Sequence, residues 1–412
     1  MTAPACRFCR APLTTTFLDL GEQPLANSYL TQAELDAGTE RAFPLHARVC
    51  GRCFLVQVDD PVAADAIFDA GYAYFSSYSE SWVAHARRYA QAMAARFSLG
   101  PQSLVVEVAS NDGYLLQHFV AMGVPVLGIE PTANTAEAAR ERGVPTEVMF
   151  FNAETGAALA ARGVQADLMA ANNVLAHVPD IGDFVAGFRH VLKPQGVLTF
   201  EFPHLLNLIE KVQFDTIYHE HFSYLSLLAV EQVLKAGGLR AFDVERLDTH
   251  GGSLRLFCAH EASAHAETEA LAALRRQEDE AGLRRLETYG GFARKVAAVR
   301  EDFLGFLARA KAEGKRVGAY GAAAKGNTFL NYCGVDARDI AWAFDANPHK
   351  QGRFLPGSHV PILSPAQVAQ VKPDYLVILP WNLKDEIMGQ LAHIREWGGR
   401  FVIASPRVEI LD

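Results

Sequence analysis

The sequence predicts an α/β protein with three units, a small N-terminal zinc module followed by two doubly wound domains. Three observations support this fold class. Two Cys-x-x-Cys pairs lie near the N-terminus, and a strand that runs into a turn and a helix is expected twice. The strand from residue 103 is β-branched, and the strand from residue 316 leads into a small-residue turn. A chain of 412 residues has room for roughly two to four domains. We expect the units to span residues 1–70, 71–240 and 241–412.

The composition excludes several classes of protein. Of the residues, 50% are hydrophobic and 21% are charged, which disfavours intrinsic disorder. The net charge of −9, with no basic run, argues against a nucleic-acid partner. No apolar stretch approaches the roughly 18–20 residues of a membrane span, and no secretory signal is found, so we expect a cytoplasmic protein without a membrane partner. The sequence shows no heptad pattern, and the oligomeric state stays open.

The first unit carries the ligands of a tetrahedral metal site. Each Cys-x-x-Cys pair can supply two thiolates from a tight turn, and we expect Gly51 to give the second turn its backbone freedom. The alternative is a chance coincidence of four buried thiols, and the duplicated spacing argues against it. Four thiolates close the coordination shell, so the predicted Zn²⁺ is structural and not catalytic. The predicted ligands are Cys6, Cys9, Cys50 and Cys53. Cys258 and Cys333 stand alone, and we expect both in the core.

A segment rich in aromatic and hydroxyl side chains follows, from Gly71 to Tyr78, and leads into a helix expected over residues 80–97. Its tyrosines and serines either line a polar pocket or form a packed linker.

The second unit begins with a strand over residues 103–108, and its turn lacks the Gly-x-Gly-x-x-Gly pattern of dinucleotide-binding loops. The next strand ends in Glu130, whose carboxylate can accept both hydrogen bonds from a ribose diol. Glu107, Asn111 and Asp112 near the first turn suit a cofactor with a sulfonium and an amino group better than they suit a diphosphate. The pattern therefore favours a nucleoside ligand that carries positive charge.

On these residues the second unit resembles the class I S-adenosylmethionine-dependent methyltransferases. Ala109 and Gly113 stand where that family has the glycines of its first motif, and residues 167–172 and 193–201 match its fourth and fifth strands. The resemblance implies S-adenosylmethionine as the cofactor, with His177 at a strand end that carries chemistry. For each of these positions, capping of a loop is the structural alternative. The implied cofactor-binding residues are Glu107, Ala109, Asn111, Gly113, Glu130, Phe151 and Asn172.

Four ionisable or polar aromatic residues follow one another after the fifth strand: Tyr218, His219, Glu220 and His221. A near-neutral imidazole takes a proton from carbon only where a neighbouring ketone acidifies that carbon, and a nearby carboxylate can orient the ring. The alternative is a metal site, which is disfavoured because adjacent side chains point in different directions. This segment therefore predicts proton abstraction next to a ketone.

With this segment, the whole chain resembles the sugar C-methyltransferases that act on nucleotide-activated 4-keto deoxyhexoses. The resemblance implies methyl transfer to C3 of a dTDP-linked or other nucleotide-linked 4-keto-6-deoxysugar, in deoxysugar and antibiotic biosynthesis. It implies that His221 is the base and that Tyr218 and Glu220 position the substrate or stabilise an enolate. It also implies that His177 and Tyr72 complete the catalytic site.

The third unit begins with charged helical sequence over residues 259–315, broken at Gly290 and Gly291. A strand, a small-residue turn and a helix follow over residues 316–327, where backbone N–H groups and Lys325 suit a diphosphate. Two more strands are expected, at 342–345 and 374–379. The chain would then contain two nucleotide-binding folds, which either bind two different ligands or arose by internal duplication. The predicted substrate-binding residues are His250, Ser253, Arg255, Tyr320, Lys325, Asn327 and Arg353.

Two further functions stay open from the sequence alone. One is a nicotinamide-dependent sugar oxidoreductase that binds its dinucleotide at the C-terminal turn. The other is a non-catalytic protein that binds a sugar nucleotide and is built around the zinc module.

Overall fold

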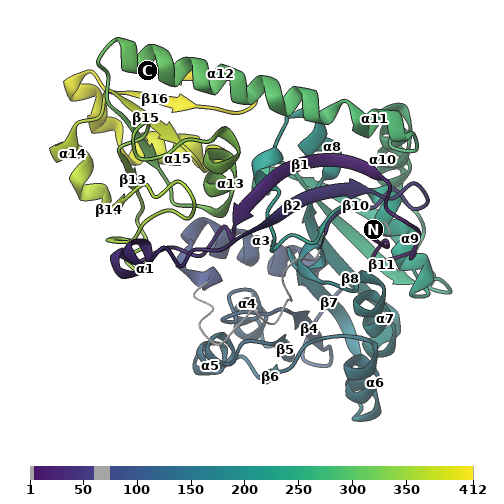
Figure 1. The fold of residues 1–412 in the computed structure, drawn as a ribbon. Coiled ribbons are helices and arrows are strands. Elements are labelled where there is room, and N and C mark those ends of the chain that lie inside the picture. Colours follow the sequence, from purple (N-terminus) through teal and green to yellow (C-terminus); the bar gives the residue numbers. More distant parts are fainter. Residues whose placement is uncertain (1–3, 60–74, 412) are drawn as a thin grey trace.

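A computed structural model describes residues 4–59 and 75–411 and places them in three sheets, one for each expected unit (Figure 1). The N-terminal sheet has the order β1-β2-β3-β9, and all its described pairings are antiparallel. Its last strand comes from the segment that follows His221 and pairs with β3. The elements of this module are β1 (Thr15–Pro24), α1 (Gln32–Ala37), β2 (Ala42–Val49), β3 (Val56–Val58) and β9 (Ser223–Tyr224).

The central sheet has the order β6-β5-β4-β7-β8-β11-β10, with the first five strands parallel and β11 antiparallel to both of its neighbours. Chain order reverses between β4 and β7, and in open α/β sheets ligands bind outside the carboxyl ends of the strands at such a switch point. The strands are β4 (Val105–Val108), β5 (Val126–Glu130), β6 (Thr146–Val148), β7 (Ala166–Asn172), β8 (Leu192–Pro203), β10 (Leu239–Leu247) and β11 (Ser253–His260).

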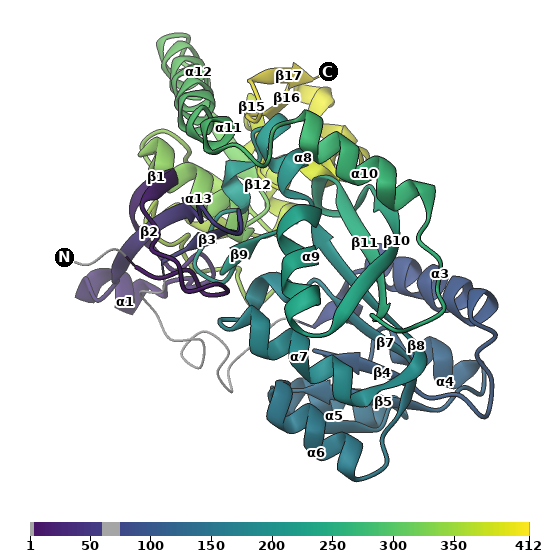
Figure 2. The same cartoon turned by 90° about the vertical axis from the view of Figure 1, so that its right-hand side faces the viewer.

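Helices cover both faces of the central sheet because successive strand residues alternate between the faces. Val105 packs with α3 and α4, whereas Val106 packs with α7 and α9. Figure 2 shows α9 and α3 on opposite sides of β10 and β11. The helices are α3 (Glu80–Arg96), α4 (Leu116–Ala121), α5 (Ala133–Glu141), α6 (Ala153–Ala161), α7 (Ile181–Val191), α8 (Leu205–Glu210) and α9 (Leu227–Ala236). Short 3₁₀ turns are η1 (Ser76–Tyr78), η2 (Leu175–His177), η3 (Phe214–Thr216) and η4 (Thr249–Gly251).

The helix expected over residues 80–97 is confirmed as α3. It begins after Ser79, whose hydroxyl accepts a hydrogen bond from the backbone N–H of Trp82 (3.3 Å). The central sheet runs to His260, about 20 residues beyond the expected boundary at residue 240. The strands β10 and β11 pair as an antiparallel hairpin. They lack the alternation of strand and helix that identified the other strands of this sheet in the sequence, and the expected boundary was therefore placed too early.

The third sheet has the order β14-β13-β12-β15-β16-β17, parallel except for β17. The strands expected near residues 316, 342 and 374 are present as β12, β13 and β15. The strands are β12 (Val317–Tyr320), β13 (Trp342–Phe344), β14 (Ile362–Leu363), β15 (Tyr375–Ile378), β16 (Arg400–Ile403) and β17 (Glu409–Leu411). The helices and turns around them are α13 (Ala324–Cys333), η5 (Pro365–Gln367), α14 (Val368–Val371), η6 (Trp381–Leu383), α15 (Lys384–Gln390) and η7 (Ala392–Trp397).

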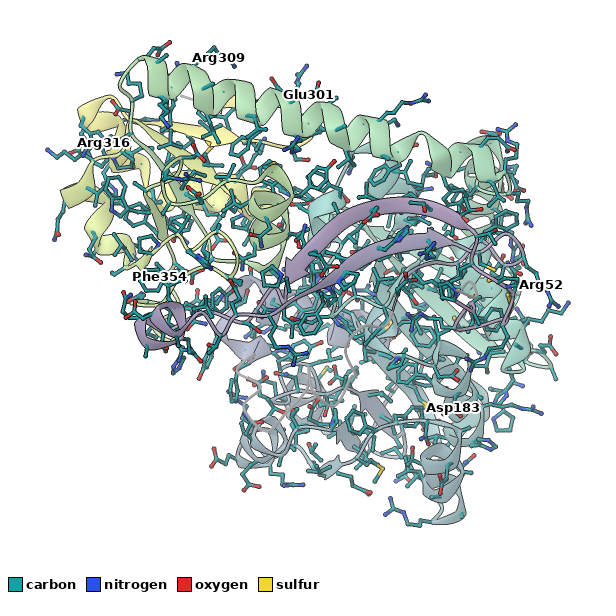
Figure 3. The ribbon with its side chains drawn as sticks, viewed as in Figure 1. Arg52, Asp183, Glu301, Arg309, Arg316 and Phe354 are labelled. Carbon is teal, nitrogen blue, oxygen red and sulfur yellow. The ribbon has the colours of Figure 1, made fainter. Side chains whose placement is uncertain are left out.

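A helical connector joins the central and third sheets and consists of α10 (Glu269–Glu280), α11 (Leu286–Gly290) and α12 (Phe292–Ala312). The expected break at Gly290 and Gly291 is confirmed, because α11 ends there and α12 begins. α12 crosses the molecule above β1 (Figure 1), and Glu301 and Arg309 project outward from it (Figure 3). On its inner side, the ring of Phe292 stacks on Phe17 of β1, with 4.6 Å between ring centroids.

The N-terminal module also contacts the third unit directly. Leu30 and Phe354 exchange two backbone hydrogen bonds (3.1 and 2.9 Å), and Figure 3 shows Phe354 beside α1. The three units therefore pack around a common centre. Within the described part of the chain, no helix has both the length and the apolar character that crossing a bilayer requires.

Candidate active site

The turn that follows β4 has the strained backbone of a ligand-binding loop. Ala109, Asn111 and Gly113 have φ values of +57°, +49° and +77°, in the left-handed region that non-glycine residues rarely adopt. A Cβ at Gly113 would lie 3.2 Å from the Cβ of Ala139 on α5, so this position needs glycine for space as well as for conformation. The predicted cofactor turn therefore lies at the switch point of the sheet.

Glu130, at the end of β5, holds this turn in place. Its Oε2 accepts a hydrogen bond from the backbone N–H of Asn111 (2.8 Å), and its Oε1 accepts from the backbone N–H of Thr132 (3.0 Å). Oε1 also accepts from the hydroxyl of Thr132, whereas Oε2 has one described partner and can accept a further hydrogen bond from a ribose hydroxyl. Asn111 itself is turned toward another segment, since its side-chain oxygen accepts from the backbone N–H of Ser76 (2.9 Å).

Glu107 lies beneath the turn and is fully buried. Burial raises its pKa above the ordinary range, the carboxylates of Glu130, Asp112 and Glu201 raise it further, and the Tyr114 hydroxyl opposes the shift. Asp112 is paired with an arginine, but among the described residues no basic side chain lies at ion-pair distance from Glu107 or Glu130. Glu107 is therefore held as a neutral carboxyl group, and Glu130 has no basic partner among the described residues.

Polar atoms without a hydrogen-bond partner in the described structure line the switch point. They are the hydroxyl of Ser110 and Oδ1 of Asp112 after β4, Oδ1 of Asn172 at the end of β7, and both amide atoms of Asn173. Buried polar atoms are normally paired, so this cluster indicates a polar ligand. With the acidic charge nearby, these residues fit S-adenosylmethionine, which carries a ribose, an amino acid group and a positive sulfur.

Phe151 lies elsewhere than expected. Its ring is in the core and packs against Phe184 and Phe188 of α7, with ring centroids 5.8 and 4.7 Å away. The neighbouring Phe150 is 55% exposed. Phe151 is therefore a packing residue in this structure, and it does not enter the proposal below.

The side chains of the Tyr-His-Glu-His segment point in different directions, as expected for neighbouring residues. Nε2–H of His219 donates to the carbonyl of Pro44 (3.2 Å), so this ring fastens the segment to the N-terminal sheet. Glu220 accepts a hydrogen bond from the amide of Asn27 (2.7 Å), and burial raises the pKa of this carboxyl group.

His221 is held as a neutral imidazole. Its Nδ1–H donates to the carbonyl of Thr216 (2.9 Å), which places the lone pair on Nε2. The hydroxyl of Tyr218 donates to that Nε2 (2.8 Å). Burial is the largest cause of a pKa well below the ordinary histidine value, and the nearby His177, His250 and Lys325 lower it further. A buried neutral imidazole with a fixed tautomer has the form that a general base requires.

His177 lies against His221, with 4.6 Å between the ring centroids. Its Nδ1–H donates to the backbone carbonyl of Glu220 (2.9 Å), and burial lowers its pKa to about 4. His250 faces the same region, and burial lowers its pKa to about 4 as well. The expected grouping of His177, Tyr218 and His221 is therefore present in the structure.

The third unit contributes Lys325 to this region. Its ammonium donates to the side chain of Asn382 (2.6 Å) and lies 4.9 Å from the ring centroid of Trp381. Lys325 follows β12, and Trp381 and Asn382 follow β15, so these contacts span the switch point of the third sheet. Trp381 Nε1–H donates to Asp215 (2.7 Å), a buried carboxyl whose pKa burial raises to about 6. Lys325 is thus a buried cation between the third unit and the catalytic segment.

The other predicted substrate residues have partners within the protein. The hydroxyl of Ser253 donates to Thr249 (2.9 Å), and Nε–H of Arg255 donates to Glu201 (2.7 Å). The amide of Asn327 donates to the carbonyl of Ala26 (2.6 Å) and is fully buried. These three side chains hold the fold together and do not enter the proposal below.

Tyr320 lies at the end of β12, and its pKa is raised by burial. Arg353 donates to the backbone carbonyl of Tyr29 (3.3 Å) on an exposed part of the third unit. Tyr72, the remaining catalytic candidate, lies outside the described residues. The end of its segment is placed, because the hydroxyl and backbone N–H of Ser77 both donate to Asp112 in the cofactor turn.

The four predicted zinc ligands converge in the N-terminal module. Their sulfur atoms all lie within 4.8 Å of one another, with 3.6 Å between Cys6 and Cys53 and 3.4 Å between Cys9 and Cys50. Four sulfurs at about 2.3 Å from a tetrahedral ion are separated by roughly 3.8 Å, so the cluster fits Zn²⁺. An N–H of Gln57 donates to Cys6 (3.2 Å), which orients that thiolate.

The expectation for Gly51 is wrong. The residue with positive φ is the one after each Cys-x-x-Cys pair, Arg10 (+61°) and Phe54 (+58°), and Gly51 is not among the residues of positive φ. The two turns are built alike, because the N–H of each of these residues donates to the carbonyl of the first cysteine of its pair (3.0 Å in both).

The sequence analysis missed several residues that hold the site. Asn27 belongs to no motif, and only its contact with Glu220 reveals it. Trp82 and His85 lie three residues apart on one face of α3, and this helical spacing is the sequence feature that could have identified them. His85 Nε2–H donates to Glu201 at the end of β8 (3.0 Å).

Comparisons with known proteins agree with the three units. Residues 6–68 match a zinc binding domain, residues 82–244 a methyltransferase domain and residues 248–406 a C-methyltransferase C-terminal domain. The chain is 37% identical over 407 residues to the C-methyltransferase NovU of Streptomyces niveus, covering 99% of this chain and 96% of that protein.

More distant relatives match a smaller share of the chain. A ubiquinone biosynthesis O-methyltransferase of Chelativorans sp. (strain BNC1) is 28% identical over 114 residues, 26% of this chain and 45% of that protein. Among solved structures, magnesium protoporphyrin IX methyltransferase from Synechocystis PCC 6803 with bound S-adenosylhomocysteine has a TM-score of 0.34 at 14% identity, covering 43% of this chain and 83% of that chain.

The full-length match decides between the three functions that the sequence left open. A methyltransferase is selected over an oxidoreductase and over a non-catalytic binding protein. The chain belongs to the S-adenosylmethionine-dependent C-methyltransferases of the NovU type, built from zinc-binding, methyltransferase and C-methyltransferase C-terminal domains.

Proposed function

We propose that this enzyme methylates C3 of a nucleotide-linked 4-keto-6-deoxysugar through an enolate, with His221 as the base. The observation that carries the proposal is the hydrogen bonding of His221, whose Nδ1–H is bound by Thr216 so that Nε2 can accept a proton. A ketone at C4 acidifies the hydrogen on C3 and so makes that proton accessible to an imidazole.

Nε2 of His221 takes the C3 proton, and the C3–H bonding pair becomes the enolate. The Tyr218 hydroxyl, which donates to Nε2 in this structure (2.8 Å), is displaced by the substrate and becomes a donor for the enolate oxygen. His177 packs against the same ring and fixes its orientation. Bound S-adenosylmethionine would supply an electrophilic methyl group to the enolate carbon. The C3–CH3 bond would form as the S–CH3 bond breaks and leaves its electron pair on sulfur, with S-adenosylhomocysteine as the by-product.

Lys325 is the proposed partner of the substrate diphosphate. Its ammonium is partly buried, and its only described hydrogen bond goes to a neutral amide. The carboxyl group of Asp215 favours its charged form, and the ammonium can donate further hydrogen bonds to an anion. The cation lies near His221 and His250, which limits the distance between the diphosphate and the reacting sugar. Glu220 is held near this unit by its hydrogen bond with Asn27, whose neighbour Ala26 contacts Asn327.

The test is the position of the transferred methyl group. The enzyme is incubated with S-adenosylmethionine carrying a ¹³C-methyl group and a dTDP-4-keto-6-deoxysugar, and the product is examined by carbon–proton correlation NMR. We expect the label on C3. The matched control is the same nucleotide sugar reduced to a C4 hydroxyl, which forms no enolate and should stay unlabelled. A label on oxygen, or labelling of the reduced sugar, would overturn the proposal.

A further inference from the structure

Trp381, in the turn η6 after β15, connects the third unit to the segment that precedes the base. Its Nε1–H donates to a carboxylate oxygen of Asp215 in η3 (2.7 Å). Asp215 is 2% exposed, and in the described part of the chain no other side chain donates a hydrogen bond to its carboxyl group. Loss of the indole N–H would therefore leave a buried carboxylate without its side-chain donor.

The indole that donates this hydrogen bond is itself held in place. Its ring lies against Gly251 in the loop before β11, where an added Cβ would clash with the ring. The ammonium of Lys325 lies 4.9 Å from the ring centroid. The protein therefore confines the ring of Trp381 and aims its N–H at Asp215.

Asp215 lies in the short turn that holds the base. The next residue is Thr216, whose carbonyl accepts the hydrogen bond from Nδ1–H of His221 (2.9 Å). The Thr216 hydroxyl donates to the carbonyl of Gln213 (2.7 Å), which closes the turn on itself. A shift of Asp215 is therefore passed to the carbonyl that orients the imidazole.

Aromatic contacts also join η3 to the third unit. Phe214 packs against Phe329 and Tyr332 of α13, with ring centroids 5.7 and 5.3 Å away. Apolar contacts hold two surfaces together without setting a direction, whereas a hydrogen bond depends on the alignment of its donor and acceptor. The hydrogen bond from Trp381 to Asp215 therefore orients a turn that the aromatic contacts keep in place.

From these contacts we propose that Trp381 is a positioning residue for proton removal by His221. Its N–H fixes Asp215, and the turn that contains Asp215 fixes the Thr216 carbonyl that holds the imidazole. Lys325 lies on the face of the same indole, so one side chain joins the proposed diphosphate site to the base. The proposal rests on the assignment of His221 as the base.

The test separates proton removal from binding. Trp381→Phe keeps an aromatic ring beside Lys325 and removes the N–H donor. Deuterium exchange at the sugar C3 is measured with S-adenosylhomocysteine bound and a saturating dTDP-4-keto-6-deoxysugar, and calorimetry gives the affinity for dTDP. We expect exchange about tenfold slower than in wild type, because the imidazole is misplaced. The affinity for dTDP should stay within about threefold of wild type, because the ring face remains.

Trp397→Phe is the matched control. The indole N–H of Trp397 donates to the carbonyl of Pro373 (3.0 Å) within the third unit, and Trp397 has no described contact with η3. This variant loses the same donor and should exchange at the wild-type rate. An unchanged exchange rate in Trp381→Phe would overturn the proposal, and so would an equal loss of rate in Trp397→Phe. If wild type shows no exchange with a bound substrate, the assignment of His221 fails and this proposal fails with it.

A second pair of variants covers the case in which Trp381→Phe does not fold. Asp215→Asn keeps an oxygen that accepts from the indole N–H, whereas Asp215→Leu has no acceptor. We expect exchange at a saturating concentration of the sugar nucleotide to be about tenfold faster in Asp215→Asn than in Asp215→Leu. Equal rates in the two variants would overturn the proposal.

Discussion

At the scale of single residues, the chemistry depends on which groups carry a proton. His221 is partly buried beside His177, His250 and Lys325, and every positive charge there opposes its protonation. A histidine with the ordinary pKa of 6.5 would be half protonated at pH 6.5, and the protonated half could not act as a base. The structure instead keeps the imidazole neutral into more acidic solution.

A pH profile follows from this shift. The base must be neutral, and its pKa is lowered, so kcat/KM should stay level from about pH 8 to about pH 6.5 and fall only in more acidic solution. The profile is measured with saturating S-adenosylmethionine and low sugar nucleotide, so that it reports the donor-bound enzyme before the sugar binds. An acid limb centred at or above pH 6.5 would contradict the assignment of His221.

At the scale of elements, much of the fold was predictable because it follows local patterns. Both strand-turn-helix units begin with a short buried strand, and each has an acidic residue at the end of its next strand. In each unit that carboxylate accepts a hydrogen bond from the first turn, Glu130 from Asn111 (2.8 Å) and Asp345 from Ala322 (2.7 Å). These parts need only neighbouring sequence to form.

Other parts depend on contacts between distant segments, which no local pattern reveals. The pairing of β9 with β3 joins residues more than 160 positions apart. Arg255 and Asn327 have the residue types of ligand-binding side chains, but Glu201 and Ala26 occupy them. Asn27 and Trp82 enter the site only through tertiary packing.

The zinc module is connected to the catalytic segment by strands. β3 begins shortly after Cys53 and pairs with β9, and β9 begins two residues after His221. The metal ligands are therefore connected through this pairing to the segment of His221, the proposed base. A displacement on the order of 1 Å can cost about a hundredfold in rate.

Loss of the metal should thus act on the rate and not on the methyl donor. We expect Cys50→Ala to lose its zinc and about a hundredfold in kcat, with S-adenosylmethionine affinity within about twofold of wild type. Metal content, calorimetry and turnover are measured in parallel. Cys333→Ala removes a buried thiol outside the cluster and should keep both zinc and activity. Full turnover by zinc-free Cys50→Ala would contradict the link.

At the scale of the whole molecule, the three units enclose one site. The N-terminal module supplies Asn27 and the central unit supplies His177 and the Tyr218–His221 segment, while Lys325 comes from the third unit. Trp381 connects the third unit to Asp215, six residues before the base (2.7 Å). Donor and acceptor can thus bind to different units and still meet at His221.

The most direct measurement is exchange of the sugar C3 proton with deuterium from heavy water. With S-adenosylhomocysteine bound, no methyl group is transferred, so exchange reports proton removal alone. Wild type should introduce deuterium at C3, and His221→Asn should bind both ligands with unchanged affinity and introduce none. Exchange at the wild-type rate in His221→Asn would contradict the account, as would an absence of exchange in wild type with a substrate shown to bind.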